Sequence, residues 1–133
     1  MPPTGLTEDA GWEIGVSRTF DRSVDEAWQI VTGPEGLARW LGTDAIPTDP
    51  GSDYETPDGT TGEIRSYRPG DRVRLTWRPK TWDHDSTVQV AVSASGRKAV
   101  VRFHQERLAN EQERNQMRER WRAALDSLTP LLT

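Results

Sequence analysis

Between residues 61 and 103 the sequence repeats one pattern, with apolar side chains at every second position and short turn signals between the runs. Alternation with a period of two is typical of strands that bury one face. Pro69-Gly70-Asp71 and Ser95-Gly96-Arg97 are turn signals between such strands. Strands joined by short turns pair in antiparallel fashion. The pattern therefore predicts an antiparallel meander, which must bury its apolar face against another element.

A helical pattern near residue 133 supplies that partner. Apolar residues recur there at spacings of three and four, which is the period of an amphipathic helix. The stripe consists of Met117, Trp121, Leu125, Leu128 and Leu132. We expect a long helix over residues 111–129, with Pro130 ending or bending it. The charged residues of this helix are interpreted as a solvated face: Glu111, Glu113, Arg114, Arg118, Glu119 and Arg122.

Two short helices are predicted between a first strand, over residues 12–20, and the meander. Ser23 and Glu26 form a capping-box pattern at the start of the first helix. Gly33-Pro34 ends this helix and begins the second, because proline fits the first helical position. The predicted order is β-α-α-β-β-β-β-β-α, an α+β fold with a six-stranded antiparallel sheet.

Composition and charge narrow the classes of function. A chain of 133 residues suits one domain, here residues 11–133 after a flexible leader over residues 1–10. A formal net charge of −4 argues against a nucleic-acid partner, because phosphate contacts need surplus cations. The absence of cysteine excludes disulfides and a thiolate metal site, and no cofactor is expected. Since no apolar run or signal peptide is recognisable, we expect no membrane span and a cytoplasmic location.

Tryptophan dominates the apolar composition. Leu, Ile, Val and Phe together number only 24 of 133 residues, whereas there are six Trp. Each Trp can bury about 150–250 Å², and rings of this size are hard to pack closely without gaps. Apolar, aromatic-lined hollows are the usual sites for small molecules. The competing interpretation for each Trp is a place in the ordinary core.

Short motifs along the chain occur in an order that resembles a known family. They are Arg18-Thr19-Phe20 with Val24-Asp25-Glu26-Ala27-Trp28, Pro34-Glu35-Gly36-Leu37, Trp40-Leu41-Gly42, Gly62-Glu63-Ile64, Leu75-Thr76-Trp77, Ser86-Thr87-Val88-Gln89-Val90, Phe103-His104-Gln105-Glu106, and residues 121–128. This order resembles the helix-grip fold of the SRPBCC superfamily, which includes START domains, polyketide cyclases and the birch-pollen-allergen type. It is most similar to the C-terminal domain of the activator of heat-shock-protein-90 ATPase, over about residues 11–132. Arg120, where many relatives carry glycine, and the compact region 43–60 depart from the pattern.

The resemblance implies a curved sheet wrapped around the C-terminal helix, with a cavity between them. We therefore expect binding of a small hydrophobic molecule, aromatic or lipid-like, without catalysis. The residues expected to line the cavity are Trp28, Trp40, Leu41, Trp77, Trp82, Val90, Phe103, Met117 and Trp121. Trp82 stands out because it lies in a polar loop, where no alternating strand pattern places it on a buried face. Its indole N–H can therefore orient a ligand carbonyl.

Two other functions stay open. An enzyme of the cyclase, aromatase or hydrolase type needs an acid or base inside the cavity. The available groups are Glu63, Arg65 and Tyr67, expected on one strand face, and His104, expected to point away from the helix.

Asp83-His84-Asp85 is interpreted as a solvated loop without a metal, since adjacent side chains diverge and no third zinc ligand is evident. A co-chaperone-like interaction module needs an exposed apolar patch, and a weak homodimer through a sheet edge is a further expectation.

Overall fold

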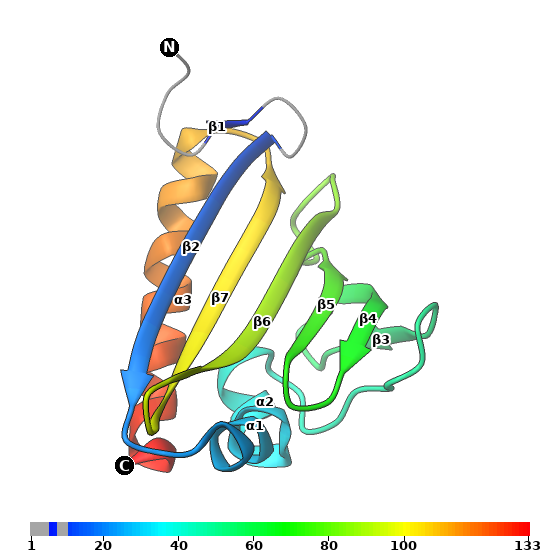
Figure 1. The fold of residues 1–133 in the computed structure, drawn as a ribbon. Coiled ribbons are helices and arrows are strands. Elements are labelled where there is room, and N and C mark those ends of the chain that lie inside the picture. Colours follow the sequence, from blue (N-terminus) through cyan, green and yellow to red (C-terminus); the bar gives the residue numbers. More distant parts are fainter. Residues whose placement is uncertain (1–5, 8–10) are drawn as a thin grey trace.

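The repeated alternation in the middle of the chain folds as a meander within one curved antiparallel sheet (Figure 1). The computed structural model describes residues 6–7 and 11–133. Its strands are β1 (Leu6–Thr7), β2 (Gly11–Phe20), β3 (Asp53–Glu55), β4 (Thr61–Arg68), β5 (Arg72–Trp77), β6 (Ser86–Ser95) and β7 (Lys98–Leu108). They pair in the order β1-β2-β7-β6-β5-β4-β3. The six predicted strands are β2 to β7. The additional β1 falls in the expected leader, of which residues 1–5 and 8–10 lie outside the described part.

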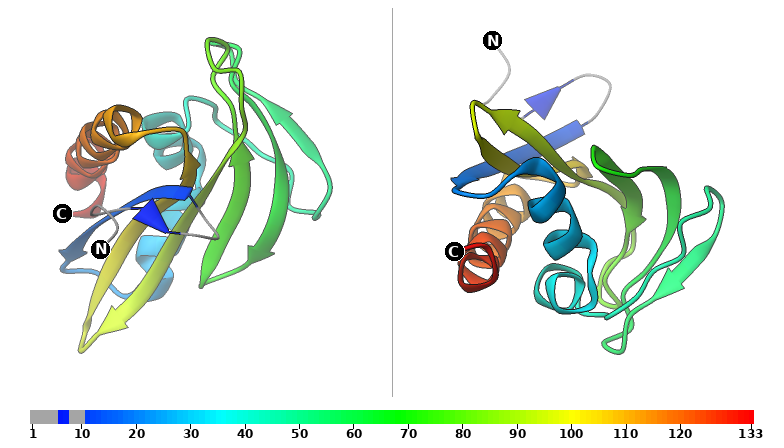
Figure 2. Two further views of the ribbon diagram at one scale, coloured as in Figure 1. Left: turned by 90° about the horizontal axis from the view of Figure 1, so that it is seen from above. Right: turned by 60° about the horizontal axis from the view of Figure 1, so that its bottom comes forward.

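Three helices lie on one face of the sheet, which bends around them (Figure 2). They are α1 (Val24–Thr32), α2 (Pro34–Trp40) and α3 (Glu111–Leu132). The predicted capping box is present at α1: the Ser23 hydroxyl accepts from the Glu26 amide at 3.2 Å, and the Glu26 carboxylate accepts from the Ser23 amide at 3.3 Å. The long α3 runs along β2 and β7 and also packs against α2. This is the predicted helix-grip architecture.

The core lies between α3 and the face of the sheet that bends toward it. The whole predicted stripe of α3 is buried. Opposite it, the alternation puts nine side chains of three strands on the inner face: Val73, Leu75, Trp77, Val88, Val90, Val92, Ala99, Val101 and Phe103. At about 25 cal/mol per Å² of hidden apolar area, this contact is the main source of stability for the fold.

The C-terminal helix is longer than predicted, because α3 continues through Pro130 to Leu132. Proline removes one backbone N–H, and so close to the helix end this loss affects a single turn. At the helix end itself, the Arg22 side chain donates to the free backbone oxygens of Leu132 and Thr133, at 3.3 and 3.0 Å. The end of α3 is thereby joined to the segment before α1.

The compact region before β4 folds back onto the sheet at a glycine. A Cβ at Gly62 would lie 1.9 Å from the Thr76 carbonyl oxygen and 2.5 Å from the Tyr54 ring. Because Gly62 has no side chain, Tyr54 of β3 can pack there, and its hydroxyl donates to the Thr76 carbonyl at 2.6 Å. This contact fixes β3 at the far edge of the sheet.

Within the described residues, no helix combines the length and the apolar character needed to cross a membrane. The same part of the chain has no group of three or more His, Asp or Glu side chains placed to hold a metal ion. The cytoplasmic location expected from the sequence stays a prediction.

Candidate functional site

An unbroken row of aromatic rings runs between α3 and the sheet. Trp121 of α3 stacks on Phe103 of β7 with ring centres 5.1 Å apart and planes 9° apart. On one side, Phe103 contacts Trp40 of α2 at 5.5 Å. On the other side, Trp121 contacts Trp77 at 5.9 Å, and Trp77 meets the edge of Trp82 at 5.2 Å. We call Trp77, Trp82 and Trp121 the tryptophan cluster.

Local structure explains how the tryptophan cluster forms. Trp77 is the last residue of β5 and shares the inward phase of Val73 and Leu75, so it is 2% exposed. The chain then turns, with the Trp82 amide donating to the Pro79 carbonyl at 2.9 Å and the Arg78 Nε donating to the Trp82 carbonyl at 3.1 Å. The turn brings Trp82 back onto Trp77, where it is half-buried. Trp82 therefore covers the outer end of the cluster.

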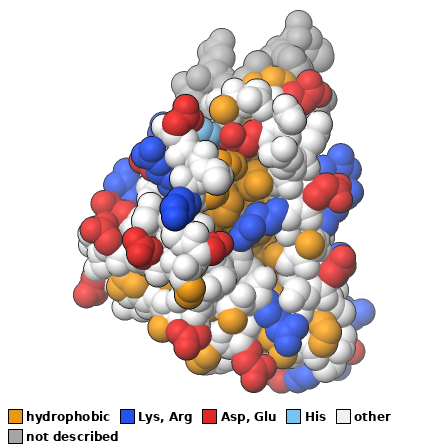
Figure 3. All heavy atoms as spheres, turned by 180° about the vertical axis from the view of Figure 1, so that it is seen from behind, with side chains coloured by type: hydrophobic (Ala, Val, Ile, Leu, Met, Phe, Trp, Pro, Cys, Tyr) orange, Lys and Arg blue, Asp and Glu red, His pale blue; other side chains and the backbone are white. Residues whose placement is uncertain are grey.

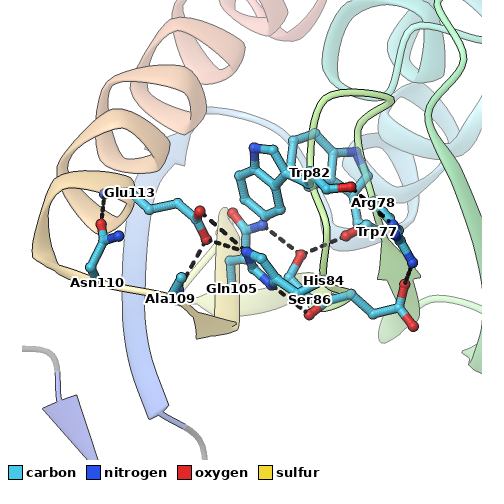
Figure 4. A network of polar contacts seen from close by, with 10 residues as sticks. Trp77, Arg78, Trp82, His84, Ser86, Gln105, Ala109, Asn110 and Glu113 are labelled. Atoms are coloured by element: carbon cyan, nitrogen blue, oxygen red, sulfur yellow. Dashed lines mark hydrogen bonds and ion pairs between the residues drawn. The ribbon is translucent and has the colours of Figure 1, made fainter.

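A buried polar chain holds the inner end of the cluster, and Figure 4 shows its Gln105, Ser86 and Trp77 members. The Trp121 Nε1 donates to the Gln105 Oε1 at 2.8 Å, and the Gln105 Nε2 donates to the Ser86 Oγ at 2.9 Å. Ser86 in turn donates to the Trp77 carbonyl at 2.7 Å. Both Gln105 and Ser86 are fully buried. Each polar group in this chain has a partner, so the Trp121 ring is held firmly in one orientation.

The indole N–H of Trp77 is different, because it has no hydrogen-bond partner in the described part of the chain. A buried donor left without an acceptor costs about 1–3 kcal/mol. Among the described residues, one other buried side-chain atom has no hydrogen-bond partner, the Nε of Arg72 at the other end of β5. An unpaired donor inside an aromatic cluster marks a point where a further acceptor group would be stabilised.

Arg120 borders the cluster from α3. Its guanidinium carbon lies 4.9 Å from the centre of the Trp77 ring and 5.4 Å from that of Trp121, which is cation–π distance. The rings displace water on one side, and this desolvation lowers the pKa of Arg120, while the charge of Asp58 opposes that shift. The other side of the residue is exposed. Arg120 stays charged in any case, since arginine does not lose its proton in proteins.

Beside the cluster lies a groove of about 220 Å³ between α2 and α3, lined by Arg39, Trp40, Arg120, Ala123 and Ala124. We call it the adjoining groove. Viewed from behind, the molecule shows a hollow with hydrophobic side chains in its floor and charged side chains around its rim (Figure 3). The groove is smaller than the roughly 300–1,000 Å³ of typical ligand pockets. A ligand of ordinary size therefore needs a lining side chain such as Arg120 to move aside.

His84 ties the loop that carries Trp82 to the start of α3 (Figure 4). The His84 ring stacks on Trp82 at 4.8 Å, and its Nε2 lies 2.9 Å from a carboxylate oxygen of Glu113. Desolvation lowers the pKa of His84. Hydrogen bonds to the Asp85 carbonyl and to Glu113, with the negative charges of Glu113 and Asp83, outweigh it, so the pKa is raised overall. Glu113 also accepts from the Ala109 amide at 3.0 Å.

These contacts correct two sequence-based interpretations. The solvated-loop interpretation is wrong for His84, which is half-buried against Trp82 and Glu113. The solvated-face interpretation is wrong for Glu113, whose side chain is 14% exposed, and for Arg114, whose Nε donates to the Glu13 carbonyl at 2.8 Å. The other four residues of that predicted face are exposed: Glu111, Arg118, Glu119 and Arg122.

The predicted site residues fall into three groups. Trp40, Trp77, Trp82, Phe103 and Trp121 form the aromatic row. Trp28 lies apart from it and packs on Tyr67 at 5.8 Å. The remaining three, Leu41, Val90 and Met117, are buried core side chains. Sequence reasoning missed the roles of five residues: Arg120, Gln105, Ser86, His84 and Glu113.

The groups proposed for an enzyme are not brought together. Glu63 and Arg65 form an ion pair of 2.9 Å, with both side chains accessible to solvent. A β-bulge between Ile64 and Ser66 shifts the phase of β4, so Tyr67 pairs with the buried Val73 and packs on Trp28. The expectation that these three residues share one strand face is therefore wrong. His104 lies on the opposite side of β7 from Phe103, as expected, with its Nε2 3.9 Å from Glu13.

A curved antiparallel sheet that grips a long C-terminal helix over an aromatic interior defines the helix-grip class, the SRPBCC superfamily. Within that class the sequence profile of one family, "Activator of Hsp90 ATPase homolog 1-like protein", matches residues 21–133. The chain belongs to this family. No curated protein matches the sequence closely enough to be counted as a relative.

Solved structures share the fold at low sequence identity. CalU16 from Micromonospora echinospora is 24% identical, with 96% of this chain and 81% of that one covered and a TM-score of 0.75. DynU16, from the dynemicin biosynthetic locus, is 20% identical with a TM-score of 0.76. The match covers 90% of this chain but only 46% of DynU16. The Aha1 dimer from Colwellia psychrerythraea is 15% identical over 90% of this chain and 95% of that one, with a TM-score of 0.68.

Proposed function

We propose that the chain binds a small hydrophobic molecule, without catalysis, where the tryptophan cluster meets the adjoining groove. The observation that carries this proposal is the aromatic row itself. Its Trp121 ring is fixed by a hydrogen bond to Gln105, while its outer ring, Trp82, is half-buried on a loop. A rigid aromatic wall behind a movable aromatic cover is suited to a ligand that stacks on indoles.

Burial supplies the binding free energy. An apolar ligand that leaves water gains about 25 cal/mol per Å² of hidden surface, so about 200 Å² contributes about 5 kcal/mol before the cost of ordering. Trp121 and Trp77 are too well packed to yield, with exposures of 0% and 2%. Entry therefore requires the loop of residues 78–85 to lift Trp82 away from Trp77.

Titration with a chemically diverse apolar library tests the proposal. We expect flat aromatic members to quench tryptophan fluorescence and to raise the melting temperature. Trp82→Ala should weaken binding, because it removes one stacking face. Trp28→Phe is the matched control, since Trp28 lies outside the cluster. If the library changes neither fluorescence nor thermal stability, the ligand-binding proposal is abandoned.

A second function, protein interaction, is favoured by a different surface. A groove of about 580 Å³ between β2 and α3 is lined by four arginines, Arg18, Arg114, Arg118 and Arg122, with Asp126 the acidic residue among its lining. The three arginines of α3 follow at four-residue spacing and so share one side of the helix. We propose that this surface, rather than the exposed apolar patch that such a module would otherwise need, would receive an acidic partner.

The family description and the solved structure of an Hsp90 activator from Plasmodium falciparum indicate which partner to test. The chain should be added to an Hsp90-class ATPase and turnover measured. Arg114→Glu with Arg118→Glu should abolish any stimulation, whereas Arg97→Glu, in the β6–β7 turn, should not. Absence of stimulation by the unaltered chain rejects this alternative. A weak homodimer through a sheet edge also stays a prediction, which analytical ultracentrifugation can test.

A further inference from the structure

We infer that the ligand class of this site is an aromatic carboxylate, a flat ring system with one acidic group. The inference rests on the proposed function and adds a specific polar requirement to it. It follows from two donors that border the same ring: the unpaired Nε1 of the buried Trp77 and the guanidinium of Arg120. A purely apolar ligand would leave the buried Trp77 N–H without an acceptor and the Arg120 charge without a counter-charge from the ligand.

The proposal places one acceptor group between the two donors, at the edge of the Trp77 ring. The Arg120 guanidinium carbon lies 4.9 Å from the centre of the Trp77 ring, and Nε1 is an atom of that ring. A carboxylate has two oxygens and can accept from two donors at once. One oxygen can take the indole N–H while the other takes an N–H of Arg120, and the aromatic part of the ligand then lies along the indoles.

Arg120 is available for this role. Its guanidinium makes no hydrogen bond and no ion pair within 4 Å to any residue of the described chain. Asp58 is the carboxylate whose charge acts on it, but Asp58 already accepts from the Thr56 hydroxyl and the Thr60 amide. Those hydrogen bonds, that of Thr56 foremost, lower the pKa of Asp58, so it stays charged and occupied. The N–H groups of Arg120 are therefore left for an external acceptor.

The charge balance favours a carboxylate over a phosphate. One guanidinium neutralises one negative charge, and the ionised Asp58 already lies nearby. A phosphate monoester carries about two negative charges at pH 7, so it would bring uncompensated charge next to Asp58. Arg120 and Asp58 together carry no net charge, so a carboxylate adds one uncompensated negative charge where a phosphate monoester adds about two.

A matched pair of probes tests the inference: 2-naphthoate and its methyl ester, which share the ring system and differ in charge. Binding should be followed by calorimetry at pH 7 for the unaltered chain, Arg120→Met, Arg120→Lys and Trp77→Phe. Arg97→Met is the control, because Arg97 is an exposed arginine in the β6–β7 turn, outside both proposed binding surfaces. Melting curves of each variant, and naphthoate titrations at low and high salt with the unaltered chain, complete the experiment.

We expect naphthoate to bind about tenfold more tightly than the ester, because a charge-assisted hydrogen bond usually raises affinity by at least this factor. Arg120→Met should erase that preference, Arg120→Lys should retain part of it, and Trp77→Phe should reduce it. The naphthoate affinity should fall with salt, because screening acts on the charged probe. Equal binding of acid and ester overturns the inference and leaves the proposed function intact. If neither probe binds, the inference and the proposed function are both overturned. Should Arg120→Met not fold, a salt-independent naphthoate affinity of the unaltered chain still contradicts the inference.

Discussion

At the scale of single residues, Gln105 has a role that its position in the sequence does not reveal. It is fully buried and links the Trp121 indole to Ser86. A polar side chain in that place restricts Trp121 to one orientation, because any other would leave the indole N–H and the Gln105 Oε1 unpaired. The aromatic wall of the candidate site is thereby rigid before any ligand arrives.

Gln105→Leu should therefore destabilise the fold by about 1–3 kcal/mol, the cost of the unpaired Trp121 N–H. Urea unfolding measures this free energy. Gln89→Leu is the control, since Gln89 is half-buried on the other face of the neighbouring strand and has one long contact of 3.5 Å to Arg74. Its effect should stay within about 0.5 kcal/mol. Equal losses in the two variants would show that the buried hydrogen bonds contribute nothing.

The sequence was sufficient to predict the residues that alternation controls. Trp77, Phe103 and Trp121 follow directly from strand and helix periods. Gln105 shares the phase of Val101 and Phe103, so its burial could have been predicted from the same pattern. Tyr67 could not be placed correctly, because a bulge in β4 has no signal in the residue types around it.

At the scale of elements, the pair of His84 and Glu113 connects a loop to a helix end. It joins residues 29 positions apart and holds the loop of Trp82 against the first turn of α3. The sequence could not predict this, because it depends on how the 78–85 loop folds rather than on any period. The groups facing His84 are Glu113 from α3 and Asp83 and Asp85 from its own loop.

Stability should depend on pH through this pair. The folded pKa of His84 is raised above its ordinary value of 6.5. The contribution is therefore fully present below pH 6.5 and is lost as pH rises through the folded pKa. In thermal melts, the difference between the unaltered chain and His84→Gln should be larger at pH 6 than at pH 8.5. His104→Gln, on the outer face of β7, is the control. A pH-independent difference would contradict the role of the charged pair.

At the scale of the whole molecule, pairing is uneven across the sheet. β7 lies between β2 and β6 and pairs along most of its length on both sides. β3 pairs through three residues with β4 alone. The two sheet halves should therefore open at different free energies.

Native-state hydrogen exchange should show this gradient. We expect the amides of β6 and β7 to exchange most slowly, near the rate set by global unfolding. Those of β3 and its flanking loops should exchange earliest among the strands. Uniform protection across the sheet would contradict the expectation. The order of the elements, and hence this gradient, was largely predictable from the sequence, whereas the short β1 was not.

The contacts within the tryptophan cluster also give the protein an internal spectroscopic reporter. Indoles with ring centres 5.2 and 5.9 Å apart couple their electronic transitions. Their circular dichroism therefore includes an exciton couplet that depends on the mutual angle of the rings. When the loop lifts Trp82 from Trp77, one of the two couplings disappears while the backbone signal is unchanged, so opening can be followed without any added label.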